Sequence, residues 1–282
     1  LVMSFDYFRN TTKDQLMTIP LPASTGSEDI VVNFGENQNV GYDFSVAGQV
    51  IRNKNWAWTS VINGSHVKDR IKQISDKLKN TAYQLEEDNP LKLRFREGGS
   101  QYDIYAVRSA GIDPATGQEI FINKNGEYTF KYDAEDEVVV GNTQPKLQGT
   151  WLNTLRYKGW SLNFVFSYTF GGDTYNKTLW EKVEDIDPRY NVDERAFTDR
   201  WKNPGDLSRY LAIKERRSTT PHNSERFVER LNELWLSSAT LTYEFQPKFL
   251  KRLGFKRLAV GVGVSDIVRF CLLYTSPSPR DS

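Results

Sequence analysis

The chain of 282 residues contains one cysteine, two histidines and two methionines. A single cysteine excludes a disulfide framework within the chain and a cysteine metal site. The net charge of +1 gives no electrostatic basis for binding nucleic acid, and we predict no nucleic-acid partner. No apolar run approaches the roughly 18–20 residues that a membrane helix requires. That absence does not exclude a membrane β-barrel, because the apolar residues of a barrel alternate with polar ones.

Aromatic residues, by contrast, are abundant at 13% of the chain, and many of them alternate with polar residues. In residues 160–170, Trp160, Phe164 and Tyr168 share one face while Ser161 and Asn163 share the other. Such alternation predicts strands with one apolar face. It recurs in seven segments, at about 1–11, 38–52, 55–68, 147–158, 159–171, 234–246 and 256–270. These strands are longer than the usual 5–6 residues of globular sheets and long enough to cross a bilayer, which takes roughly 9–11 tilted residues.

The connections between these strands alternate between short and long. The short ones lie at 53–55, 158–159 and 246–254, and the long ones at about 14–37, 69–146 and 172–233. A membrane barrel has short turns on its periplasmic rim and long loops on its outer rim. We therefore predict an all-β fold in which the chain forms about seven strands of an antiparallel transmembrane β-barrel with long extracellular loops. The alternative is a large soluble antiparallel sheet or sandwich.

Aromatic residues also gather at the predicted strand ends. Trp56, Tyr157 and Trp160 flank the short turns, and Tyr168 and Phe170 lie at the far end of their strand. Aromatic side chains favour the headgroup levels of a bilayer, so we expect these two groups to mark its two surfaces.

Enzymatic signatures are weak, and we predict neither catalysis nor a cofactor. The segment 171–173 is not a phosphate loop, because no Lys-Ser/Thr pair follows it. The acidic residues Glu181, Glu184, Asp185 and Asp187 lack the ordered spacing of a known calcium loop. A solvated loop face is the favoured interpretation of this cluster.

The loop 172–233 is the best candidate for contact with a substrate or partner. It combines many charges with aromatic residues, of which we single out Trp180, Tyr190, Trp201 and Tyr210. A loop of this composition binds a sugar, a peptide or a partner protein, or it packs on itself as a lid.

An ordered set of short stretches carries a resemblance to a known family. The matching stretches are 16–22, 33–41 (NFGENQNVG), 110–117 (AGIDPATG), 141–146, 166–176, 200–206 (RWKNPGD), 224–227 and 236–243. In this order they resemble the C-terminal part of the SusC/RagA group of TonB-dependent outer-membrane transporters of Bacteroidetes. Members of that group continue beyond the last strand found here and end the barrel with an aromatic residue.

The resemblance implies nutrient uptake across the bacterial outer membrane. A protein of this group has a plug domain inside a roughly 22-stranded barrel and contacts the TonB complex through a region outside this chain. A SusD-like lipoprotein helps it to capture glycans or peptides. Two alternatives remain at this point: a passive porin, and a surface adhesin or binding barrel.

The last residues, 271–282, do not continue the strand pattern. They contain the cysteine, Pro277 and Pro279 among serines, and no alternation. They resemble the translation of a sequencing adaptor, so we expect residues 1–270 to form the barrel segment and 271–282 to be an artefactual tail.

Overall fold

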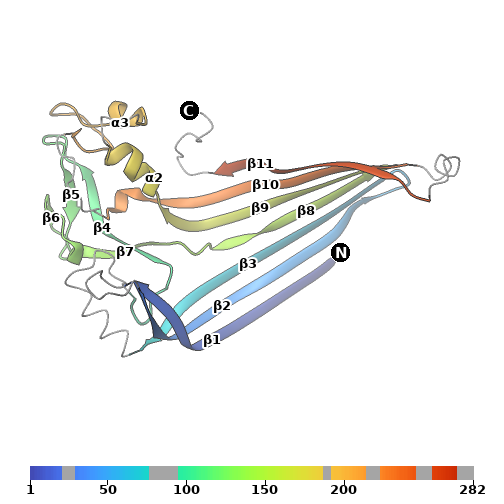
Figure 1. The fold of residues 1–282 in the computed structure, drawn as a ribbon, viewed down its shortest axis with the longest axis horizontal. Coiled ribbons are helices and arrows are strands. Elements are labelled where there is room, and N and C mark those ends of the chain that lie inside the picture. The colour runs from blue at the N-terminus through green and yellow to red at the C-terminus, as the bar shows by residue number, and fades with distance from the viewer. Residues whose placement is uncertain (21–28, 76–94, 187–191, 214–222, 246–255, 272–282) are drawn as a thin grey trace. The chain divides into compact units, whose positions relative to one another are not determined.

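The computed structural model describes the chain except for residues 21–28, 76–94, 187–191, 214–222, 246–255 and 272–282 (Figure 1). It divides into two compact units. The first, here called the seven-stranded sheet, comprises Leu1–Gln101, Gln144–Gly172 and Leu231–Leu272. The second, here called the loop module, is built mainly from Tyr102–Thr143 and Asp173–Arg230.

All seven strands predicted from the alternation are present, and neighbours along the chain are neighbours in the sheet (Figure 1). The strands are β1 (Val2–Pro20), β2 (Asp29–Arg52), β3 (Trp56–Ile74), β8 (Leu147–Tyr157), β9 (Trp160–Tyr175), β10 (Val228–Glu244) and β11 (Ala259–Cys271). The pairs β1–β2, β2–β3, β3–β8, β8–β9 and β10–β11 are antiparallel. β1 and β11 are the two edge strands.

The register places apolar residues on one face of this sheet. Ile62 pairs with Trp151, which pairs with Phe166, and the Trp151 and Phe166 rings stack 5.6 Å apart. The opposite face is mostly polar, as where Thr154 Oγ1 donates to Asn163 Oδ1 across 2.8 Å, but it also carries a row of paired apolar residues, Val61, Leu152 and Val165. A soluble sandwich buries its apolar face against a second sheet. Here Trp160 is 48% exposed and Val262 68% exposed, so this face suits lipid rather than a protein layer.

Two polar residues interrupt the apolar face, and each accepts a hydrogen bond from the indole N–H of a tryptophan. Ser60 and Asn153 lie directly opposite each other on β3 and β8. The Trp58 indole donates to Asn153 Oδ1 at 3.0 Å, and the Trp151 indole donates to Ser60 Oγ at 2.8 Å. A polar group that faces hydrocarbon without a partner is costly, so these pairs let indole rings occupy a lipid-facing surface.

At one position a glycine on β3 faces a glycine on β8, and the two strands approach closely beside a tyrosine side chain. Gly64 pairs with Gly149, which pairs with Tyr168 on β9. The Tyr168 hydroxyl donates to the Asn63 carbonyl at 2.8 Å. A Cβ on Gly149 would lie 2.0 Å from the Asn63 carbonyl oxygen and 2.7 Å from the Tyr168 hydroxyl. The close approach at this point therefore requires glycine.

Some strands are longer than the sequence pattern indicates, and the predicted long connection at 14–37 is wrong. β1 continues to Pro20 and pairs it with Asp29 on β2. Register shifts between Thr12 and Leu16, with Asp14 at a left-handed φ of 53°, break the alternation there. A bulge of this kind leaves the two strands paired but shifts the alternation of side chains between the two faces of the sheet. The period-two pattern in the sequence therefore stops before the strands end.

The first two short turns and the aromatic residues beside them lie where the sequence predicts. Tyr168 and Phe170 are not at the end of their strand, because β9 continues to Tyr175, and the bilayer levels of both aromatic groups stay a prediction. In the first turn, Asn53 Oδ1 accepts from the backbone N–H groups of Asn55 and Trp56. In the second turn Lys158 has a left-handed φ of 51°. The Trp56 and Tyr157 ring centroids are 4.3 Å apart. The third turn, at 246–254, lies outside the described residues.

The loop module contains a second sheet, of four strands in the order β6-β5-β4-β7. The stretch 110–117, whose Asp-Pro and Thr-Gly pairs are typical of turns, leads from β4 to β5, and β5 and β6 form a small hairpin. The strands are β4 (Asp103–Ile112), β5 (Glu119–Ile122), β6 (Tyr128–Thr129) and β7 (Glu137–Asn142). The short helical turns are η2 (Ala134–Asp136), α2 (Lys177–Leu179), η3 (Trp180–Glu184), α3 (Arg195–Thr198) and η5 (Glu225–Phe227). Among the described residues, none of these helices has the length and apolar character to cross a membrane.

Cys271, which the sequence assigns to the tail, is the last residue of β11 and pairs with Glu233. The rest of the predicted tail, 272–282, lies outside the described residues, and its artefactual origin stays a prediction.

Candidate binding site

The loop module has its own hydrophobic core, formed by residues that are far apart in the sequence. Its buried members are Leu179, Val183, Ile186, Ala196, Tyr210 and Phe227, with Tyr175, Trp180 and Val192 packed against them. Phe227 is 1% exposed. Close packing of this core fixes the positions of the segments around it, whereas a solvated loop has no such packing.

A buried arginine joins segments from two different connections. Arg226, on η5, forms ion pairs with Glu119 at 3.0 Å and with Glu184 at 2.6 Å. It also donates to the Arg209 carbonyl at 2.7 Å. Burial, the largest single influence, disfavours the charge, but Glu184 and Glu119 together raise the pKa of Arg226 above its ordinary value. The Arg226 guanidinium thus links β5, which carries Glu119, to η3, which carries Glu184.

A second buried arginine binds only backbone carbonyls. Arg200, 5% exposed, donates to the carbonyls of Ala196 at 2.9 Å and Leu211 at 3.0 Å. Its Nη2 donates to the carbonyls of Val183 and Glu184. Burial lowers the pKa of this guanidinium, Glu184 opposes the shift, and Arg226 adds to it. Arg200 therefore holds three backbone segments together.

The stretches 110–117 and 200–206, both part of the family resemblance, meet in this module. The Trp201 indole donates to the Pro114 carbonyl at 2.8 Å, and its ring lies against Gly117. Gly117 has a φ of 75°, and a Cβ there would lie 2.5 Å from the Trp201 ring. The Asp113 carboxylate accepts from Thr116 Oγ1 and the Ala115 N–H, which lowers the pKa of Asp113. The turn 113–117 and Trp201 form one docked unit.

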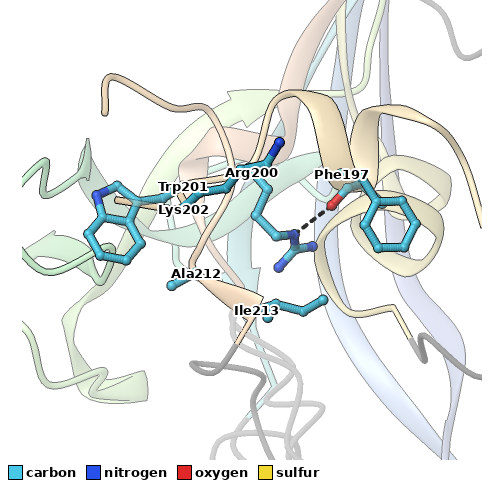
Figure 2. A pocket seen from close by; sticks show the side chains of 7 residues that line it. Phe197, Arg200, Trp201, Lys202, Ala212 and Ile213 are labelled. Atoms are coloured by element: carbon cyan, nitrogen blue, oxygen red, sulfur yellow. Dashed lines mark hydrogen bonds between the residues drawn. The ribbon is translucent and has the colours of Figure 1, made fainter. Parts of the chain in front are cut away.

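A pocket of 370 Å³ lies beside this docked unit, and Trp201 is part of its lining. Its lining residues are Ala196, Phe197, Arg200, Trp201, Lys202, Ala212 and Ile213. Figure 2 shows the Arg200 guanidinium between the Ile213 side chain and the Phe197 ring, while the Trp201 indole points away from Phe197. The volume lies within the range of small-molecule sites, which is roughly 300–1,000 Å³. This pocket is the candidate binding site.

The structure gives the four predicted contact residues different positions. Trp201 and Tyr210 are 7% and 3% exposed, and Tyr210 belongs to the core. Trp180 packs against that core, and Tyr190 lies outside the described residues. The self-packed alternative accounts for Trp201 and Tyr210, and contact of the four with a ligand or partner stays a prediction. Sequence reasoning did not single out Phe197, Ile213 or the two arginines, because their roles depend on partners far along the chain.

The acidic cluster near 181–187 is not a uniformly solvated face. Glu184 is 4% exposed and paired with Arg226, whereas Glu181 forms an exposed ion pair with Lys177. The interpretation as a solvated face is therefore wrong for Glu184, since burial in the module core was not visible in the local sequence. Within the described residues, no group of three or more potential ligands is placed to hold a metal ion.

No family model matches the chain. The TonB-dependent receptor P39 of Formosa agariphila is 25% identical over 96% of the chain, and the receptor P3 of the same organism is 26% identical over 96%. The chain spans about 30% of the length of the first and 28% of the second.

Solved structures show the same fold. A structure of the RagAB peptide transporter matches 96% of the chain and 30% of the matched chain, with a TM-score of 0.77 and 20% identity. A structure of the RagAB peptide importer in the "open-open" state matches 95% of the chain with a TM-score of 0.75 and 19% identity. The predicted barrel fold is confirmed by these matches, and the relatives support a receptor rather than an enzyme. The comparisons give no support to a sequencing-adaptor origin of the tail. Along nearly its whole length the chain is thus similar to TonB-dependent receptors, and it has the fold of part of a RagA-type outer-membrane barrel.

Proposed function

We propose that this chain forms part of the barrel wall and the outer loops of a receptor that imports nutrient oligomers across the outer membrane. The observation that carries the proposal is the combination of two features in one chain. The seven-stranded sheet has an apolar face suited to lipid, and the loop module is a packed domain with its own pocket. A simple pore needs the first feature and not the second.

The chain's own contribution is structural and selective. Its strands form a wall whose polar face suits a water-filled or plugged lumen. Its loop module supplies a rigid surface on which a nutrient is captured. Energy for import comes from the TonB complex, acting through a region that lies outside this chain, and no residue here is assigned to that coupling.

Peptides are our preferred nutrient, with glycan oligosaccharides as the alternative. The likeness to the RagAB peptide transporter supports peptides, although it extends to the fold alone. We further propose that a SusD-like surface lipoprotein acts with the receptor. Exposed apolar residues on the loop module, Phe197 and Leu207 among them, support contact with a ligand or partner.

Uptake by cells that carry the complete receptor tests this proposal. We expect labelled oligopeptides to accumulate in cells with the receptor and to fall to background when either the receptor or TonB is deleted. A lipoprotein should co-purify with the receptor from the outer membrane. Uptake that persists without TonB would favour a passive porin, and surface binding without uptake would favour an adhesin; either result would contradict the proposal.

A further inference from the structure

The walls of the pocket are apolar. Phe197 and Ile213 are 46% and 44% exposed, while Ala196 and Ala212 are buried at 0% and 2%. Half-exposed apolar side chains around a concavity gain free energy when a ligand's apolar group covers them. The pocket therefore favours an aliphatic or aromatic group over a hydroxyl-rich one.

The charge of the lining has one sign. Two of the seven lining residues, Arg200 and Lys202, are cationic, and none is acidic. Most of the Arg200 N–H groups already bind backbone carbonyls, so this side chain contributes mainly its charge. Lys202 is exposed, and within the described part of the chain its ammonium has no ion pair; the Asp206 carboxylate accepts from the Lys202 backbone N–H at 3.1 Å instead. A ligand carboxylate at the pocket mouth would meet an available cation.

A neutral sugar fits this lining poorly. Sugar recognition needs several hydrogen-bonding side chains to match its hydroxyl groups, because an unmatched polar group loses its hydration without compensation. Here the side chains able to form hydrogen bonds are two cations and one tryptophan, and the Trp201 N–H is bonded to Pro114.

We propose that the pocket between Phe197 and Ile213 binds an apolar group that carries a carboxylate, with Lys202 as the partner of the carboxylate. The C-terminal residue of a peptide, when its side chain is apolar, has this chemistry. The inference rests on the proposed function, since it names the chemical class of nutrient that the loop module captures.

Calorimetry on the complete, purified receptor tests the site with two small probes, N-acetylphenylalanine and its neutral amide. We expect the acid to bind up to about fivefold more tightly than the amide, which is the effect of one exposed ion pair. Lys202→Met should remove that difference while leaving the affinity for the amide unchanged. Phe197→Ala should weaken the binding of both probes by about tenfold, because it removes an aromatic wall.

Phe130→Ala is the matched control, since Phe130 is a 53% exposed phenylalanine of the same module that does not line the pocket. It should bind both probes like the unmodified receptor. The site is refuted by absence of saturable binding of the acid in the millimolar range, by equal affinity for acid and amide, or by equal losses in Phe130→Ala and Phe197→Ala. If the binding experiment fails but uptake still depends on TonB, only the assignment of the pocket is overturned. If uptake does not depend on TonB, the proposed function itself is overturned.

Discussion

Arg226→Met opens the loop module locally, without affecting the strands of the seven-stranded sheet. The change removes the guanidinium that pairs with Glu184, a carboxylate that is 4% exposed. Loss of one partner of a buried ion pair costs about 3–5 kcal/mol, because the remaining charge stays buried. Amide hydrogen exchange of the complete receptor measures this opening directly. Peptides covering 177–186 and 224–230 should exchange more than about a hundredfold faster than in the unmodified receptor.

A matched surface pair provides the control for this experiment. Lys177 and Glu181 form an ion pair at 3.3 Å in the same module, but their side chains are 74% and 44% exposed. Lys177→Met should change exchange by less than about fivefold, since an exposed pair contributes at most about 1 kcal/mol. Adding Glu184→Gln to Arg226→Met should restore part of the protection. Equal exchange in the Arg226→Met and Lys177→Met receptors would show that the buried pair does not fasten the module.

Gly149→Ala prevents normal assembly of the sheet. The new Cβ would lie 2.0 Å from the Asn63 carbonyl oxygen, which belongs to the backbone of the neighbouring strand and cannot rotate away. β3 and β8 must then separate at the position where Gly64 faces Gly149. We expect a cost of about 3 kcal/mol or more, at the upper end of overpacking effects. The amount of heat-modifiable, folded receptor in the outer membrane should fall severalfold.

Gly48→Ala is the comparison for Gly149→Ala. Gly48 lies in β2 of the same sheet, and a Cβ added there would have Leu1 Cδ1 as its nearest neighbour, at an ordinary contact distance of 3.5 Å. The Gly48→Ala receptor should reach the membrane at the unmodified level. Normal folding of Gly149→Ala would mean that the two strands do not approach as closely as described here.

The seven strands were predictable because a sheet with one apolar face leaves a period-two pattern in the sequence. Residues 160–170 show this directly, since the apolar residues from Trp160 to Phe170, apart from Val165, fall on one face. The pattern ended before several of the strands do, most clearly where the backbone departs from regular pleating. At Thr12–Leu16 the register shifts, so the continuation of β1 and β2 to Pro20 and Asp29 was missed.

The loop module was much less predictable, because its structure depends on contacts between distant segments. The sequence shows Trp201 and Gly117 as an aromatic residue and a turn glycine, 84 positions apart, and gives no sign that the ring covers the glycine. The same holds for Glu119 and Arg226, which pair across two connections. For the aromatic residues Trp201 and Tyr210 the sequence therefore left contact with a ligand and self-packing open, and the structure buries both. The one local signal is the turn chemistry of 110–117, since its Asp-Pro and Thr-Gly pairs are typical of a reversal, and the segment does join β4 to β5.

The central claim is that the strands cross the outer membrane with the loop module outside the cell, and cysteine labelling tests it most directly. Asn125, in the β5–β6 turn, and Lys54, in the β2–β3 turn, are both exposed. In a complete receptor whose own cysteines are replaced by serine, Asn125→Cys should react with a membrane-impermeant maleimide on intact cells. Lys54→Cys should react only after the outer membrane is permeabilised. Labelling of Lys54→Cys on intact cells, with Asn125→Cys protected, would contradict the account.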